Sequence, residues 1–257
     1  MRIVIKIGTS TLTYSTGNLN IRHIENLCKV ISDIKNAGYE VILVSSGAVG
    51  MGMGKLGLRE RPKKLALKQA AASVGQCELM YVYDRQFGEY NHTVAQVLLT
   101  AGNLRDAEQH ANFTNTIRCL LELGVIPVIN ENDTVAVKEL IIGDNDTLAA
   151  IVAESVEAEL LILLSDIDGL YTADPSQNAE AQFIPLVEKI TPEIEKLAGG
   201  AGSVVGTGGM VTKLEAAKIA TEASCDMVIA NGQDPAVLYD ILDGKSVGTR
   251  FLGRKKT

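Results

Sequence analysis

The chain has 257 residues, of which 46% are hydrophobic, and its 24 Lys and Arg against 31 Asp and Glu give a net charge of −7. This length can bury a substantial core without disulfide or metal support. The acidic balance argues against a nucleic-acid partner, because binding a phosphate backbone requires clustered Lys and Arg. No run approaches the roughly 20 consecutive apolar residues of a membrane span, so we expect a soluble cytoplasmic protein without a membrane partner.

The spacing of the cysteines argues against a zinc site. They are scattered singly, with no CxxC pair and no histidine cluster nearby. This pattern predicts reduced, mostly buried thiols and no zinc site. The four residues are Cys28, Cys77, Cys119 and Cys225.

The predicted elements alternate between strands and helices. The apolar run 3–7 predicts a strand, and apolar residues spaced by three and four predict a helix over 21–36. Asn20 is placed to cap this helix and Gly38 to end it. We expect further strands at 40–44, 93–99, 125–129, 160–164 and 227–229. The other helices are expected at 63–87 with a break near Gly75, through 113–121, and at 146–157, 210–223 and 237–242.

Strands that are almost continuously apolar and separated by helices predict a mostly parallel sheet covered on both faces, that is, an α/β fold. Ligands of such sheets bind at the carboxyl ends of the strands. Here those ends are followed by Gly8, by Ser46, by the run from Asn130 to Asp133, and by Ser165 with Asp166. No shift in composition marks a domain boundary, although a second strand-loop-helix unit begins near residue 158.

Two glycine-rich segments are candidate phosphate loops. Gly52 to Gly57 matches GxGxxG, but Gly52 lies eight residues after the end of the expected strand at 40–44, which favours a flexible loop over a dinucleotide site. The segment from Gly206 to Lys213 joins a glycine-rich turn to a helix start and a lysine, a pattern that suits an anion. Its alternative is a plain loop followed by a helix with a surface lysine.

Charged residues near the strand ends are the remaining candidates. Lys6 lies inside an apolar strand, where its charge is costly unless it reaches an anion or solvent. The clusters Asn130 to Asp133 and Gly143 to Asp146 favour a polar ligand or a cation, the alternative being that Asp146 is an ordinary helix N-cap. The histidines, at positions 23, 92 and 110, lie outside these loops, which disfavours histidine acid-base catalysis.

Six segments occur in an order that closely resembles the glutamate 5-kinases of the amino acid kinase family, from residue 2 to about residue 251. They are Lys6-Ile-Gly-Thr-Ser, Ser45-Ser-Gly-Ala, Val128-Ile-Asn-Glu-Asn-Asp, Gly143-Asp-Asn-Asp, Gly169-Leu-Tyr-Thr-Ala-Asp-Pro and Gly206-Thr-Gly-Gly-Met. The resemblance implies a three-layer α-β-α sandwich and transfer of the ATP γ-phosphoryl group to the side-chain carboxylate of L-glutamate, the first step of proline biosynthesis. It also implies a single domain, with an amino-acid-binding lobe at about 1–157 and a nucleotide-binding lobe at about 158–257.

The resemblance also assigns site residues. Lys6 and Lys213 would approach the phosphoryl group from opposite sides, and Asp146 would orient both of them. Ser46, Asp133 and Asn145 would bind glutamate, with Asp133 facing its α-ammonium group. Mg²⁺ would be held mostly by ATP and water, with no protein ligand assigned. The nucleotide-binding set is Lys6, Gly8, Ser165, Asp166, Thr207, Gly208, Gly209, Met210, Val211, Thr212 and Lys213.

Further expectations rest on the family. Many members carry a C-terminal RNA-binding-type module, which we do not expect here because the chain ends at Thr257. Feedback inhibition by proline is a family expectation, and an oligomer is suggested by the apolar helix stretch at 65–83, which would equally suit a core. Two other functions stay open: an acetylglutamate, aspartate or uridylate kinase of the same fold, and a non-catalytic nucleotide- or amino-acid-binding regulator.

Overall fold

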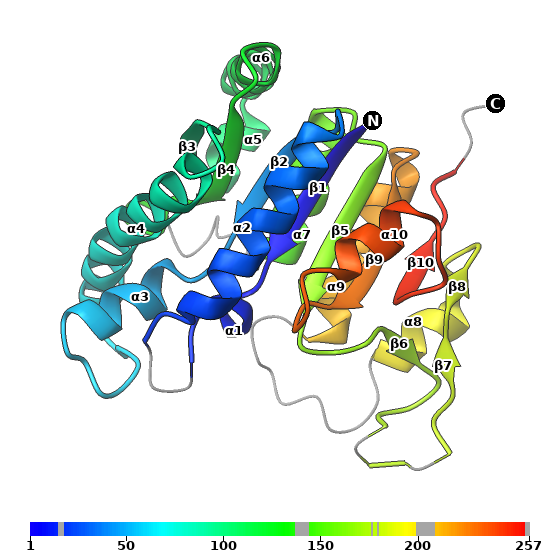
Figure 1. Cartoon of the computed structure of the whole chain (residues 1–257). Helices are drawn as coiled ribbons and strands as arrows, with labels where there is room; N and C mark the ends of the chain where they lie inside the picture. The colour runs from blue at the N-terminus through cyan, green and yellow to red at the C-terminus, as the bar shows by residue number, and fades with distance from the viewer. Residues whose placement is uncertain (15–17, 137–143, 176, 179, 199–208, 255–257) are drawn as a thin grey trace.

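An eight-stranded sheet forms the centre of the protein (Figure 1). The computed structural model describes the chain except for residues 15–17, 137–143, 176, 179, 199–208 and 255–257. The strand order is β3-β4-β2-β1-β5-β9-β10-β8, and β6 and β7 form a separate pair. The strands are β1 (Arg2–Ile7), β2 (Glu40–Ser45), β3 (Val94–Leu99), β4 (Ile126–Glu131), β5 (Leu160–Ser165), β6 (Leu170–Tyr171), β7 (Phe183–Ile184), β8 (Leu186–Val187), β9 (Asp226–Asn231) and β10 (Thr249–Phe251).

The central sheet is mostly parallel, as the sequence predicts. β1 pairs in parallel with β2 on one side and with β5 on the other, and within this sheet only the pairing of β10 with β9 is antiparallel. The helices are α1 (Thr9–Leu12), α2 (Ile21–Asn36), α3 (Ala48–Lys55), α4 (Leu65–Gly88), α5 (Ala101–Arg105), α6 (Ala107–Glu122), α7 (Asn145–Ser155), α8 (Pro192–Ala198), α9 (Met210–Glu222) and α10 (Val237–Leu242).

Helices cover both faces of the sheet, which confirms the three-layer α-β-α architecture (Figure 1). Successive strand residues face opposite sides. In β1, Ile3, Ile5 and Ile7 pack with α2, α4 and α10, whereas Val4 packs with α7 and α9. Lys6 shares the parity of Val4, so the strand directs this lysine toward the layer of α7 and α9.

The prediction of a flexible loop at residues 52–57 was wrong, because Gly52 lies within helix α3. Helix α4 also runs through Gly75 without the expected break. A Cβ on Gly52 would lie 1.8 Å from the Ala71 carbonyl oxygen, and one on Gly75 would lie 1.7 Å from the Ala48 carbonyl oxygen. These glycines therefore let the backbones of α3 and α4 touch, and neither serves a dinucleotide loop.

Several short elements had no counterpart in the predicted pattern. β6, β7, β8 and β10 have two or three residues each, which is too few to show a period of two. Helices α1 and α5, with four and five residues, are similarly too short for a helical repeat. The longer predicted strands and helices are confirmed, with ends that shift by one or two residues in most cases.

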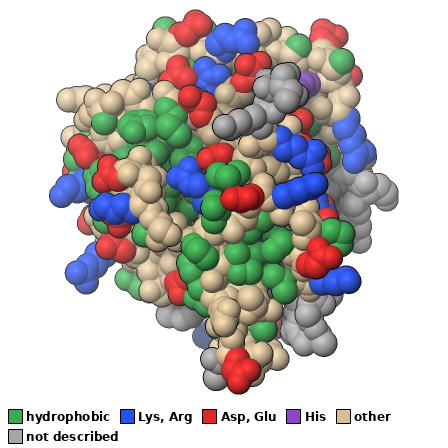
Figure 2. Space-filling view, turned by 90° about the vertical axis from the view of Figure 1, so that its right-hand side faces the viewer, with side chains coloured by type: hydrophobic (Ala, Val, Ile, Leu, Met, Phe, Trp, Pro, Cys, Tyr) green, Lys and Arg blue, Asp and Glu red, His purple; other side chains and the backbone are tan. Residues whose placement is uncertain are grey.

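Cys28 and Cys225 are buried but Cys77 and Cys119 are exposed, so the prediction of mostly buried thiols was wrong for two of the four. Figure 2 shows acidic, basic and apolar side chains interspersed over the side of the molecule that carries β8 and β10. Within the residues that the structure describes, no helix has the length and apolar character needed to cross a bilayer.

Candidate active site

A pocket of about 540 Å³ opens at the carboxyl ends of β1, β2, β4 and β5. This is the edge of the sheet where the sequence places the site. The pocket collects residues far apart in the chain, including predicted residues from each of these four strand ends. From the predicted set its lining contains Lys6, Gly8, Ser46, Asp133, Asn145, Asp146, Ser165, Asp166 and Lys213.

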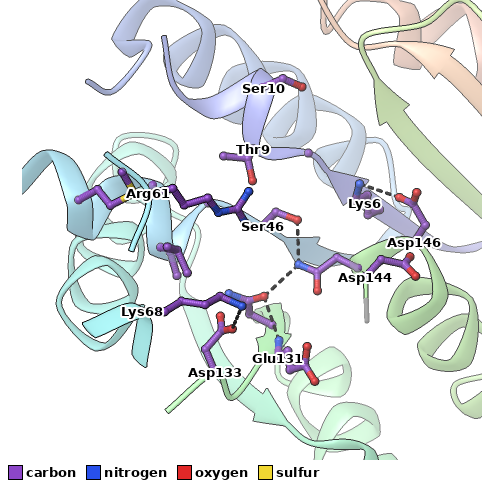
Figure 3. Close-up of a pocket in the computed structure, with 18 of the residues that line it drawn as sticks. Lys6, Thr9, Ser10, Ser46, Arg61, Lys68, Glu131, Asp133, Asp144 and Asp146 are labelled. Carbon is purple, nitrogen blue, oxygen red and sulfur yellow. Dashed lines mark hydrogen bonds and ion pairs between the residues drawn. The ribbon is translucent and has the colours of Figure 1, made fainter. Parts of the chain in front are cut away.

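Two lysines and one aspartate form a buried cluster at one end of this pocket. Figure 3 shows two of them, Lys6 and Asp146, directed toward each other. Lys6 Nζ lies 2.6 Å from one carboxylate oxygen of Asp146, and Lys213 Nζ lies 3.0 Å from the other. The exposed fractions of Lys6, Asp146 and Lys213 are 8%, 0% and 3%. Two cations thus share one anion, and the three side chains together carry one net positive charge in a region of low solvent access.

Opposing effects set the pKa of Asp146. Burial raises its pKa, but the charges of Lys6 and Lys213 and their hydrogen bonds lower it by more, so the net shift is downward. Thr212 adds a hydrogen bond from its hydroxyl to the same carboxylate, at 3.1 Å. Asp146 is therefore ionised at neutral pH and fixes the position of both ammonium groups.

Asp144 and Asp146, at the start of α7, have different roles. Asp144 is the N-cap, because its carboxylate accepts a hydrogen bond of 2.8 Å from the Thr147 backbone N–H. Asp146 lies in the first turn of the helix and points at the lysines. The alternative that Asp146 is an ordinary cap was thus wrong, and so was the alternative of a surface lysine at Lys213.

A row of amide groups lines the middle of the pocket. Asn145 Nδ2 donates to Ser46 Oγ at 2.8 Å and to Asn130 Oδ1 at 3.0 Å. The backbone N–H of Glu131 also donates to Asn130 Oδ1, which leaves Asn130 Nδ2 to donate to Gln76 Oε1 at 2.9 Å. Because both amide hydrogens of Asn145 have acceptors, its Oδ1 is the atom left to accept from a ligand, and Ser46 can donate its hydroxyl hydrogen.

The other end of the pocket carries Asp133 with two cations that the sequence reasoning missed (Figure 3). Lys68 Nζ lies 3.8 Å from Asp133 Oδ1, and Arg61 lines the same region. Burial raises the pKa of Asp133, and the charges of Lys68 and Arg61 partly offset this effect. Neither cation stands next to a strand end or a glycine motif, so no local pattern singled them out.

The predicted nucleotide-binding residues are only partly placed. Gly8, Ser165 and Asp166 line the pocket beside Lys6. Met210, Val211 and Thr212 form the first turn of α9 after its N-cap Gly209, and these four lie outside the pocket lining. The predicted Thr207 and Gly208 lie outside the described residues.

Comparisons with other proteins agree with this geometry. The model of the amino acid kinase family matches residues 1–231. A glutamate 5-kinase of Clostridium perfringens is 55% identical over 258 residues, which cover 99% of this chain and 96% of that protein. One from Listeria innocua is 52% identical, with coverage of 99% and 94%. One from Moorella thermoacetica is also 52% identical, and the match covers 99% of this chain and 67% of that longer protein.

Solved structures share the fold at lower identity. Carbamate kinase from Giardia lamblia bound to AMP-PNP matches with a TM-score of 0.69 and 16% identity, over 98% of both chains. UMP kinase from Ureaplasma parvum matches with a TM-score of 0.66 and 19% identity, also over 98% of both chains. The chain therefore belongs to the amino acid kinase family and, within it, to the glutamate 5-kinases.

Proposed function

We propose that this chain transfers the γ-phosphoryl group of ATP to the side-chain carboxylate of L-glutamate, giving glutamyl 5-phosphate and ADP, the first step of proline biosynthesis. The observation that carries the proposal is the buried Lys6–Asp146–Lys213 cluster at the strand ends, next to a row of amides suited to an amino acid. Relatives at 52–56% identity that are named glutamate 5-kinases support the same acceptor.

In this reaction the protein forms no covalent bond with either substrate. A carboxylate oxygen of glutamate forms a bond to the γ-phosphorus while the bond from that phosphorus to the β,γ-bridging oxygen breaks, and the electron pair leaves with ADP. The attacking carboxylate is already ionised at neutral pH, so no general base is needed. The protein's contribution is alignment of the two substrates and stabilisation of the charge on the transferred group.

Each residue of the cluster has a distinct part in this proposal. Lys6 and Lys213 contact the transferring phosphoryl group and stabilise its charge. Asp146 is a positioning residue, because its ionised carboxylate holds both ammonium groups in place before substrates bind. Burial of all three strengthens these interactions relative to the same charges in water.

The nucleotide and the acceptor take opposite parts of the pocket. We assign ATP to Gly8, Ser165, Asp166 and the start of α9, and glutamate to Ser46, Asn145 and Asp133. The described residues hold no group of three or more His, Cys, Asp or Glu that could bind a metal ion. In this proposal, as the family resemblance implies, Mg²⁺ would be held by the phosphates of ATP and would neutralise their charge.

The remaining assignments rest on the family. We assign a cytoplasmic location, where ATP and glutamate are available. We also propose a homo-oligomer, since Leu65, Leu67 and Tyr81 on α4 are exposed, and sedimentation tests it. Inhibition by proline is tested by adding proline to the assay.

The experiment that tests the function measures ADP release and trapping of the acyl phosphate by hydroxylamine. Mg-ATP is supplied with L-glutamate, N-acetylglutamate, aspartate or UMP in parallel. We expect glutamate alone to give both ADP and a hydroxamate. A stronger response to another acceptor would assign a different kinase of the same fold. No acceptor-dependent ADP release at all would favour a non-catalytic regulator.

A further inference from the structure

The pocket has a second cationic end that the transfer chemistry does not use. Lys68, in the first turn of α4, and Arg61, in the segment between α3 and α4, both line it. Figure 3 shows the two side chains directed into the pocket from the side opposite Lys6 and Asp146, with Ser46 between them. A substrate that spans the pocket therefore meets a cationic group at each end.

Asp133 places a negative charge beside the cations at this end of the pocket. Its carboxylate lies 3.8 Å from Lys68 Nζ, so an anion and a cation are presented side by side. A free α-amino acid carries the complementary pair on one carbon atom, an ammonium group and a carboxylate. Arg61 is a second cation near Asp133, so it can meet an incoming carboxylate while Lys68 pairs with Asp133.

The groups in the middle of the pocket suit the same orientation. Asn145 keeps its Oδ1 to accept a hydrogen bond, while Ser46 can donate one, because the Asn145 amide hydrogens are both engaged. Such a pair accepts from an ammonium and donates to a carboxylate. An acceptor with its α-carbon near Asp133 then extends its side-chain carboxylate toward Lys6.

We propose that Lys68 and Arg61 bind the α-carboxylate of the acceptor while Asp133 takes its α-ammonium, so that these three residues select a free α-amino acid. The inference rests on the proposed function, because it assumes that glutamate is the acceptor. An acceptor whose α-carboxylate is converted to an amide leaves the two cations without their anion. An N-acylated acceptor leaves Asp133 without its cation. A site built to pair charged groups rejects analogues that lack them.

The experiment compares L-glutamate with its α-amide, in which the side-chain carboxylate is intact. Steady-state constants are measured for the wild-type protein, for Lys68→Met and for Arg61→Met. Loss of one charge-assisted contact corresponds to roughly a 10- to 100-fold loss in kcat/KM. We expect this loss for glutamate in both variants, mainly as a higher KM, with the KM for ATP unchanged. The α-amide, which lacks the contact, loses little.

Lys64→Met is the matched control, because Lys64 is an exposed lysine one turn before Lys68 and lies outside the pocket lining. It should keep the wild-type preference for glutamate over the α-amide. If Lys68→Met and Arg61→Met also keep that preference, the inference is overturned while the proposed function stands. If the wild-type protein releases no ADP with glutamate, the proposed function itself fails.

Discussion

The pKa of Asp146 is raised by burial and lowered more strongly by Lys6 and Lys213, so this residue predicts that the stability of the protein depends on pH. In the folded protein the pKa of Asp146 lies below the ordinary value of about 3.9, which applies to the unfolded chain. The carboxylate therefore contributes its full stabilisation above about pH 3.9 and loses it as the pH falls through the pKa of the folded protein. Asp146→Asn removes the contribution and leaves two buried ammonium groups without their anion. We expect a loss of about 3 kcal/mol at pH 7.

Urea denaturation from pH 7 down to pH 3 measures this effect. The difference in unfolding free energy between the wild-type protein and Asp146→Asn should be constant near neutral pH and should shrink below about pH 4. A difference that stays the same across the whole range would show that the carboxylate charge contributes nothing to stability.

The sequence alone could not predict which of Asp144 and Asp146 caps α7. Asp144 and Asp146 lie two positions apart before an apolar run, and both residues suit an N-cap. Only the backbone geometry decides that Asp144 caps α7 while Asp146 faces Lys6 and Lys213. The motif resemblance named three residues that the structure brings together, but the local pattern alone left a plain cap as an equal alternative.

At the scale of helices, the contact between α3 and α4 predicts a large effect from a single methyl group. A Cβ on Gly75 would lie 1.7 Å from the Ala48 carbonyl oxygen, and backbone cannot yield as a side chain can. Gly75→Ala should therefore destabilise the protein by about 3 kcal/mol or more, since the helices must separate.

Gly88→Ala is the control, because Gly88 lies on the same helix with open space around the position of its Cβ, and this variant should be nearly neutral. Thermal unfolding of both variants checks this, and equal melting temperatures would contradict the close contact.

Helix α4 also holds the amide row in place through Gln76. This side chain is 9% exposed and accepts the hydrogen bond from Asn130 Nδ2. Gln76→Met keeps the volume but removes the acceptor, so Asn130 and then Asn145 lose their fixed orientation. We expect the KM for glutamate to rise about 10-fold, a loss of about 1.4 kcal/mol, while the KM for ATP stays the same.

A double-mutant cycle separates this role from a general loss of stability. If Gln76 acts through Asn130, the effects of Gln76→Met and Asn130→Leu on glutamate KM should not add, because both remove the same hydrogen bond. Additive effects would mean that Gln76 does not position Asn130.

These helix contacts explain why the sequence predicted the strands better than the pocket. A buried parallel strand is visible as an apolar run, and each long strand was found in this way. The contact of Gly52 with Ala71 joins residues from separate helices, and no periodicity within one helix reveals it. Arg61 and Lys68 were missed for the same reason, because their place in the pocket depends on how the segment after α3 and the start of α4 lie relative to Asp133.

In the whole molecule, the order of the strands creates the site. β1 is flanked by β2 on one side and β5 on the other, so the chain leaves the centre of the sheet in two directions. Ligands bind at such a switch point, outside the carboxyl ends of the strands. Lys6 is the penultimate residue of β1, Gly8 follows that strand, and Ser165 ends β5. All three therefore lie at this point, which agrees with the prediction from sequence.

We propose that the two lysines held by Asp146 act on the transferred phosphoryl group. Single-turnover transfer of the γ-phosphoryl group from ATP to glutamate tests it most directly, with Lys213→Met compared with Lys218→Met. Lys218 lies on the same helix but pairs with Glu195 and Glu215 at the surface. We predict that Lys213→Met binds both substrates but transfers roughly 100- to 1,000-fold more slowly, as expected when a preorganised charge is lost from the transition state, while Lys218→Met matches the wild-type rate. Transfer by Lys213→Met at the wild-type rate would contradict the account.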